Sequence, residues 1–337
     1  MQKLSLADIN TFTQQLRSLI RSKVELLPAL NILYEHTSKQ EMRKVVYSLY
    51  EDVAKGRMLS ESLSRFPQYF SPLYISIIRA GENAGQLEEA LNQISAFLSS
   101  SEDLRRKIQT ALLYPAFMLV MGVITLLVLF NFVIPRLNII FKDFGQNLPL
   151  PTKILLRSSD VFRSIWFWLL VAGAGILVFR FTDLSSFKMR LPILGRVLRE
   201  GAIARFSRSF SLLLRGGVSI FDGLRIASPS LDDKQMVKEV EKVCEKVISG
   251  SSLSDSISCL SSFPAYFKRM LVVGEKGGRL EEVLNELAED YERRVEAGFK
   301  MITSLIEPII ILILGIILGG IIIAMLLPIF EMSMLAK

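Results

Sequence analysis

The chain has 337 residues, enough for about two domains of ordinary size, and half of its residues are hydrophobic. The net charge of +7 is spread along the chain, and basic and acidic residues nearly balance in its polar regions. No basic tract therefore indicates nucleic-acid binding, and we expect no nucleic-acid partner. The two cysteines, Cys244 and Cys259, are too few for a disulfide framework, and we expect both to be reduced.

The first polar region, residues 1–110, has the apolar spacing of amphipathic helices. Phe12, Leu16 and Leu19 recur at helical intervals, and no run of residues alternates as a strand would. Gly56 is expected to end one helix and Ser60 to cap the next, as Ser254 does in the second polar region. We therefore predict an all-α bundle of about six helices.

A glycine- and glutamate-rich motif, "GENAGQLEEAL", lies near the end of this region. We expect a helix to end near Gly81, Gly85 to form the turn, and a new helix to begin at Leu87. Acidic residues in the first turn of a helix are stabilising by roughly 0.3–1 kcal/mol. A turn explains the glycines and part of the acidic residues, whereas the alternative is a partner-docking surface made by Glu82, Glu88 and Glu89.

Three apolar stretches predict transmembrane helices. Residues 111–134 and 304–330 are long enough to cross a hydrocarbon core of about 30 Å. The stretch at 164–182 is shorter, and it spans the core if Arg180 extends to the interface. The predicted organisation is bundle 1–110, span 111–134, extracytoplasmic loop 135–163, span 164–182, bundle 183–303, span 304–330 and extracytoplasmic tail 331–337.

The second polar region repeats the first. "FSRSFSLLLRGG" from Phe206 aligns with "FTQQLRSLIRSK" from Phe12, and "FPAYF" at Phe263 aligns with "FPQYF" at Phe66. The glycine motif recurs as "GEKGGRLEEVL" from Gly274. Its acidic residues are further docking candidates: Glu275, Glu281 and Glu282.

The repeat constrains the topology in the membrane. Two parallel copies place both bundles in one compartment, and the unrepeated middle span returns the chain between them. Basic residues are modestly enriched beside the bundles, which favours a cytoplasmic location for the bundles and the N-terminus. We expect the loop and the C-terminus to lie outside.

The first and third spans carry the candidate membrane-packing or intramembrane residues. Glu307, an ionisable group inside a span, precedes Pro308, and Tyr114 precedes Pro115 at the matching position of the first copy. Glu307 has a functional role in one interpretation, and in the other it extends to the interface or pairs with a basic residue. Gly315 and Gly319 form a GxxxG pattern that allows close helix packing.

Nothing in the sequence indicates catalysis. His36 is the single histidine, and the residues around it form no catalytic constellation. The glycine motif lacks the Lys-Ser or Lys-Thr of a phosphate loop, so we expect no enzyme activity, cofactor or metal.

The parallel repeats, the two glycine motifs, "ALLYP" before the first span and "IEP" before the third together resemble one family. It is the F-type inner-membrane platform family of type II secretion systems, also found in type IV pilus and competence pseudopilus assembly. The resemblance covers almost the whole chain. Many members have a further cytoplasmic segment before the first repeat, and we do not expect the contacts of that segment here.

The resemblance implies a mechanical role. A family member couples a separate cytoplasmic ATPase to the assembly of pilin-like subunits into a fibre. The implied partners are this ATPase, other inner-membrane assembly components, pilin-like or pseudopilin subunits, membrane lipids and further copies of the chain.

The alternative function is a transporter or channel subunit. A transporter needs polar groups at mid-membrane, whereas Asn131 and Glu307 lie near the ends of their spans. The sequence therefore favours the assembly platform.

Overall fold

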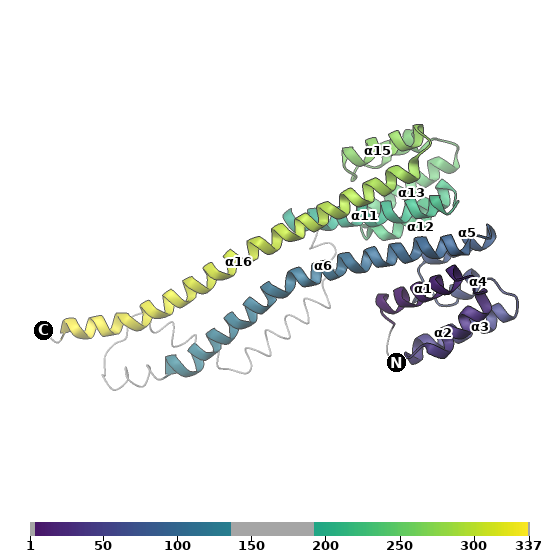
Figure 1. The fold of residues 1–337 in the computed structure, drawn as a ribbon. Coiled ribbons are helices and arrows are strands. Elements are labelled where there is room, and N and C mark those ends of the chain that lie inside the picture. The colour runs from purple at the N-terminus through teal and green to yellow at the C-terminus, as the bar shows by residue number, and fades with distance from the viewer. Residues whose placement is uncertain (1–3, 136–191, 336–337) are drawn as a thin grey trace. The chain divides into compact units, whose positions relative to one another are not determined.

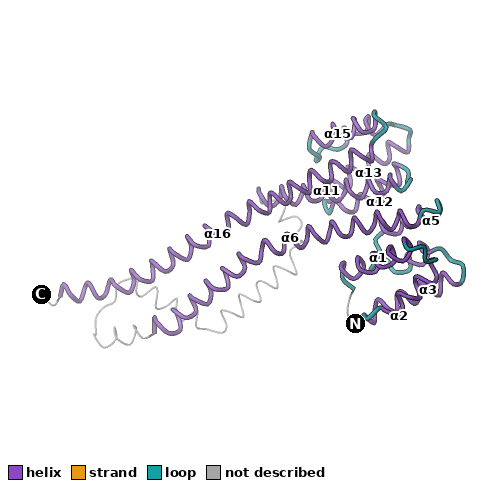
Figure 2. Tube along the Cα trace, viewed as in Figure 1, coloured by secondary structure: helices purple, strands orange, loops and turns teal. Residues whose placement is uncertain are grey.

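The computed structural model describes residues 4–135 and 192–335, and within these ranges all regular structure is helical (Figures 1 and 2). Contacts divide the chain into two compact units. One comprises residues 1–107 and 195–297, and the other comprises residues 108–194 and 298–337. The first unit holds both repeated bundles. Both consist of helices, which confirms the all-α prediction.

Six helices contribute to the first bundle, as the sequence predicts. The last of them, α6, continues beyond the bundle. The helices are α1 (Leu6–Arg21), α2 (Leu26–His36), α3 (Gln40–Ala54), α4 (Leu59–Ser64), α5 (Pro72–Asn83) and α6 (Leu87–Val128).

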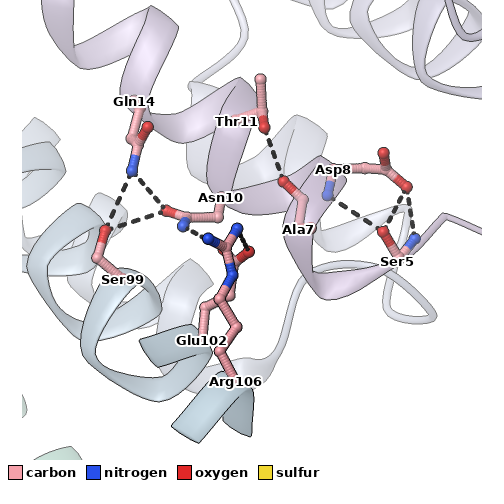
Figure 3. A network of polar contacts seen from close by, with 9 residues as sticks. All are labelled: Ser5, Ala7, Asp8, Asn10, Thr11, Gln14, Ser99, Glu102 and Arg106. Atoms are coloured by element: carbon pink, nitrogen blue, oxygen red, sulfur yellow. Dashed lines mark hydrogen bonds and ion pairs between the residues drawn. The ribbon is translucent and has the colours of Figure 1, made fainter. Parts of the chain in front are cut away.

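The start of the first bundle is held by side chains that satisfy free backbone groups. The Asp8 amide donates to Ser5 Oγ, and the Ser5 amide donates to Asp8 Oδ2 at 2.7 Å (Figure 3). This reciprocal arrangement is a capping box. Further along α1, Asn10 Nδ2 donates to Glu102 Oε2 at 2.7 Å, and Gln14 Nε2 donates to Ser99 Oγ at 3.1 Å. These bonds join α1 to α6.

The second bundle repeats this order with two short 3₁₀ segments inserted. Its elements are α11 (Pro192–Arg215), α12 (Ile220–Ala227), η2 (Ser228–Leu231), α13 (Lys234–Ile248), α14 (Leu253–Ser256), η3 (Ile257–Cys259), α15 (Ala265–Lys276) and α16 (Leu280–Leu335).

The buried aromatic residues show which positions of the repeats are equivalent. The rings of Phe12 and Phe70 lie 6.0 Å apart at 62°, and those of Phe206 and Phe263 lie 6.1 Å apart at 62°. Phe263 thus occupies the place of Phe70, and the alignment of Phe263 with Phe66 is wrong. The matching letters of the two motifs lie in different register, because Pro264 is the N-cap of α15 whereas Pro67 precedes the start of α5 at Pro72.

Each bundle contains a buried carboxylate, and the two carboxylates have different hydrogen-bond partners. In the first bundle, Asp52 Oδ2 accepts from Arg65 Nη1 at 2.6 Å, and Arg57 lies on the other oxygen. In the second bundle, Glu239 Oε2 accepts from the Ser262 amide at 2.9 Å. Buried charges require such partners, since an unpaired one is strongly destabilising. Each bundle is therefore stabilised by its own buried carboxylate, whose oxygens accept hydrogen bonds.

Two helices of the second unit are long and apolar enough to cross a membrane. They are the later parts of α6, with a π-helical segment η1 at Leu129–Val133, and of α16. Phe130, Ile134 and Ile321 pack together between them. The predicted spans 111–134 and 304–330 are thus helical. The predicted span 164–182 lies outside the described residues, so a total of three spans stays a prediction.

Each span continues a bundle helix directly: α6 runs to Val128 and is followed by η1, and α16 runs to Leu335. Pro115 lies within α6, and Pro308 lies within α16. The sequence predicts a bundle followed by a span. It does not predict that the last helix of the bundle continues into the span.

Candidate functional site

The repeated glycine motif forms the same helix–turn–helix structure in both bundles. In the first copy α5 ends at Asn83, Gly85 has a φ of 67°, and α6 begins at Leu87. In the second copy Gly278 has a φ of 65°, and α16 begins at Leu280. Glycine adopts this left-handed backbone without strain. The predicted turn is confirmed in both copies.

The first glycine of each motif allows two helices to approach closely. A Cβ atom on Gly81 would lie 2.4 Å from Cβ of Ala90, and one on Gly274 would lie 3.0 Å from Cβ of Val283. A side chain at either position would force the two helices apart. This glycine is therefore required by packing.

The first glutamate of each motif caps a short helix. Glu82 accepts hydrogen bonds from the Leu59 amide at 2.6 Å and the Ser60 amide at 2.8 Å, at the start of α4. Glu275 accepts from the amides of Leu253 at 2.7 Å and Ser254 at 2.5 Å, at the start of α14. A carboxylate that satisfies unpaired amides at a helix N-terminus is stabilising.

This finding changes the expected capping residues. Ser60 and Ser254 lie inside α4 and α14, whose N-cap residues are Met58 and Ser252. The prediction that the two serines are the caps is wrong, because a glutamate from a distant helix supplies the acceptor. Docking of a partner at Glu82 and Glu275 stays a prediction, and both carboxylates already have a structural role.

The paired glutamates of the motifs lie in the first turns of α6 and α16. Lys23 Nζ lies 3.0 Å from Glu88 Oε2, and Gln93 Nε2 donates to Glu89 Oε1 at 3.2 Å. In the second copy Arg279 lies 4.0 Å from Glu282. The Glu281 carbonyl, by contrast, accepts from Ser211 at 2.7 Å, which fixes its backbone.

The two acidic turns differ in their nearest basic residue. Lys23 has a φ of 62°, and the matching position of the second repeat is Gly217, with a φ of 77°. Glycine suits this left-handed turn, but it supplies no cation. The α11–α12 turn, residues 216–219, contains no lysine that could form an ion pair with Glu281. Among the described residues, each turn thus has one ion pair, and the pair of the first turn, Lys23–Glu88 at 3.0 Å, is tighter than that of the second, Arg279–Glu282 at 4.0 Å.

The two spans meet at equivalent residues. Tyr114 Oη donates to Glu307 Oε1 at 3.2 Å, and each of these residues precedes the proline that marks its span, Pro115 or Pro308. A basic partner for Glu307 was one expectation, and the structure instead supplies the phenol of Tyr114. This hydrogen bond gives one carboxyl oxygen a donor. Burying a carboxyl group without a partner in hydrocarbon is costly. An intramembrane functional role for either residue stays a prediction.

Close helix contact in the second unit occurs at a glycine that the sequence analysis did not identify. A Cβ atom on Gly122 would lie 3.0 Å from Leu314 Cδ1. A Cβ atom on Gly315 or Gly319 would meet no described atom within 4 Å. Gly122 has no glycine four residues away, so no packing pattern marks it. Packing at Gly315 and Gly319 stays a prediction.

A charged pair joins the first and second repeats within the first unit. Lys107 Nζ lies 2.9 Å from Glu296 Oε2. Both side chains are exposed, so the pair contributes at most about 1 kcal/mol. This ion pair could not be predicted from the sequence, since its two residues are far apart in the chain. In the described part of the chain, no three His, Cys, Asp or Glu residues form a group that could hold a metal.

Comparison with known proteins gives consistent matches over nearly the whole chain. The family "Type II secretion system (T2SS), protein F" matches residues 12–135 and 206–328. The type IV pilus assembly protein PilC of Pseudomonas aeruginosa is 32% identical over 98% of this chain and 91% of its own. PilC of Thermus thermophilus is 33% identical over 97% and 82%. Type II secretion system protein F of P. aeruginosa is 31% identical over 98% and 84%.

Proposed function

The chain belongs to the type II secretion system protein F family, and we propose that it is the inner-membrane platform of a secretion or type IV pilus-like machine. In this role it couples a cytoplasmic ATPase to the polymerisation of pilin-like subunits. The chain itself performs no chemistry and acts as a mechanical link. Its relatives are named for both type II secretion and type IV pilus assembly.

The observation that carries the proposal is the helix shared by each bundle and its span. α6 and α16 each begin at an acidic turn and continue into the apolar segment that follows, which in the first copy ends in the π-helical η1. A helix of this kind transmits a displacement at the turn toward its span, and Pro115 in α6 and Pro308 in α16 are the positions where a missing backbone hydrogen bond allows a bend. A partner bound at the turn could in this way act on the membrane part of the chain.

The ATPase contact is proposed at the acidic turn of the second repeat. The side chain of Glu282 is 60% exposed and contacts Arg279 only at 4.0 Å, whereas that of Glu88 is 37% exposed and pairs with Lys23 at 3.0 Å. An acidic surface of this kind fits a basic surface on the partner. Glu88 and Glu89 form a weaker version of the same surface, since Lys23 partly neutralises it.

The remaining partners follow from the same role. Pilin-like subunits and other inner-membrane assembly components are proposed to contact the two apolar helices, whose side chains are largely exposed within the second unit. Phe117 and Leu113 are 61% and 70% exposed, as side chains that face lipid or another membrane helix would be. Both bundles are proposed to lie in the cytoplasm and the C-terminus outside.

The proposal is tested by charge reversal in a strain that lacks this chain. Glu281→Lys with Glu282→Lys should abolish fibre assembly or secretion, whereas Glu88→Lys with Glu89→Lys should reduce it mildly. Like charges at an interface cost several kcal/mol, more than one helix-terminus interaction contributes.

Glu286→Lys is the matched control, since this exposed acidic residue lies in the next turn of α16. All variants are compared at equal amounts of membrane-inserted protein. Normal assembly with all four glutamates reversed would show that the acidic turns dock no partner.

A further inference from the structure

One contact between the two bundles is made by helices that are not equivalent in the repeat. α5 of the first bundle lies against α12 of the second. In the turn before α12, a Cβ atom on Gly216 would lie 3.8 Å from Cβ of Ala80 on α5. The counterpart of α5 is α15, and the counterpart of α12 is α2. A contact between non-equivalent surfaces leaves one surface of each kind uncovered, on which the same contact can form again.

The uncovered counterpart of α5 is one face of α15, which we call the α15 face. It consists of Tyr266, Arg269, Val273 and Lys276, spaced as one stripe of a helix. Tyr266 is 46% exposed and Val273 is 60% exposed. The residue of α5 that matches Tyr266 is Leu73, which is only 8% exposed.

The uncovered counterpart of α12 is one face of α2, which we call the α2 face. It consists of Glu25, Pro28, Ile32 and Glu35, all of them exposed. Ile32 is 37% exposed, whereas its counterpart Ile226 packs against the buried core. The sequence therefore leaves an isoleucine exposed on α2 at the position where α12 has a partly buried one.

The two faces are complementary in charge. Arg269 and Lys276 flank Val273 on the α15 face, and Glu25 and Glu35 flank Ile32 on the α2 face. Within the described chain, Arg269 and Lys276 form no hydrogen bond or ion pair, so their charges are available to a partner. An apolar centre with a charged rim of opposite sign on the two sides is the composition of a protein–protein interface.

We propose that the α15 face of one copy of this chain binds the α2 face of a second copy. The contact uses the same pair of helix positions as the α5–α12 contact inside the chain, with charged residues added on each side. The occupant is a second copy because the chain itself carries the complementary surface.

The first test is disulfide formation between two copies of the full chain that carry different tags. Cys244 and Cys259 are first replaced by alanine, and Val273→Cys is placed in one copy and Ile32→Cys in the other. We expect a linked dimer that contains both tags, and only when both variants are expressed together.

Ile248→Cys is the matched control, since Ile248 is an apolar side chain on α13 that is 64% exposed and belongs to neither face. Equal linkage through Cys at position 248, linkage between two copies of the Val273 variant, or a chain that is monomeric in mild detergent would overturn the proposal.

The second test reverses the charges. Arg269→Glu with Lys276→Glu should weaken copurification of the two tagged copies by roughly tenfold or more, and Glu25→Lys with Glu35→Lys should do the same. When one copy carries the first pair and the other carries the second, the complementary charges are restored, and association should recover. Unchanged association of the reversed variants, or no recovery in the mixture, would contradict the proposed pairing.

Discussion

At the residue scale, Glu82 and Glu275 show how a surface motif serves the fold. Each carboxylate lies at the end of one helix and satisfies two amides at the start of another, distant in sequence. A short helix such as α14, with four residues, has few internal hydrogen bonds. Its stability therefore depends on an acceptor from outside.

We predict that Glu275→Gln destabilises the second bundle by about 1–3 kcal/mol, because an amide offers one acceptor where the carboxylate offers two charged ones. The measurement is thermal unfolding of the purified chain in detergent. Glu282→Gln, which removes an exposed carboxylate with only a 4.0 Å contact to Arg279, should leave the unfolding temperature nearly unchanged. Equal unfolding temperatures for wild type and Glu275→Gln would refute the capping role.

Glu239 makes the stability of the second bundle depend on pH. Burial alone would raise the pKa of Glu239, but hydrogen bonds from Ser261 and Ser262 outweigh it and hold the pKa below its ordinary value of 4.5. A lowered folded-state pKa contributes stability above pH 4.5 that is lost as the pH falls through the folded-state value.

Glu239→Gln should therefore lower the unfolding temperature most at neutral pH, and the gap to wild type should narrow in acid, below about pH 4. Glu241→Gln, an exposed neighbour on the same helix, serves as the control. A gap that stays constant from pH 7 to pH 3 would mean that the Glu239 carboxylate does not supply the stabilisation.

At the element scale, the turn between α5 and α6 is determined by two glycines with different functions. Gly85 supplies a left-handed backbone, and Gly81 supplies space. The two are distinguishable by substitution, because only one of them has a neighbour in contact.

We predict that Gly81→Ala destabilises the first bundle by about 1–3 kcal/mol, since the new methyl group would overlap Ala90. A compensating Ala90→Gly change should restore part of the loss, which a purely local effect on α5 would not allow. The readout is thermal unfolding of the full chain, and a Gly81→Ala variant as stable as wild type would contradict the close packing of α5 on α6.

The helices and the turn could be predicted from sequence because their signals are local. Apolar spacing predicts the bundle helices, and Gly85 with Gly278 predicts the turns. The capping by Glu82, the pair of Tyr114 with Glu307 and the contact at Gly122 depend on residues that only the fold brings together. Matching letters also misplaced Phe66 against Phe263, because a short motif can repeat at a shifted register while the buried rings keep their geometry.

At the scale of the whole molecule, the parallel repeat requires a return span between the bundles. We predict that single cysteines at Ser38 and Ser230 resist an impermeant thiol reagent in intact cells, whereas one at Asn147, outside the described residues, reacts. The native cysteines are first removed, and permeabilised cells serve as the control in which all three react. Labelling of Ser38 and Ser230 together would invert the topology, and labelling of only one would exclude three spans.

The central claim is that the chain links a cytoplasmic ATPase to fibre subunits. The most direct measurement is purification of the tagged full chain from its own cells in mild detergent, with identification of the proteins retained. The account predicts retention of the assembly ATPase and of pilin-like subunits, and loss of the ATPase with Glu281→Lys and Glu282→Lys. Retention of neither, by a purified chain that passes solutes across liposomes, would contradict the platform and favour a transporter.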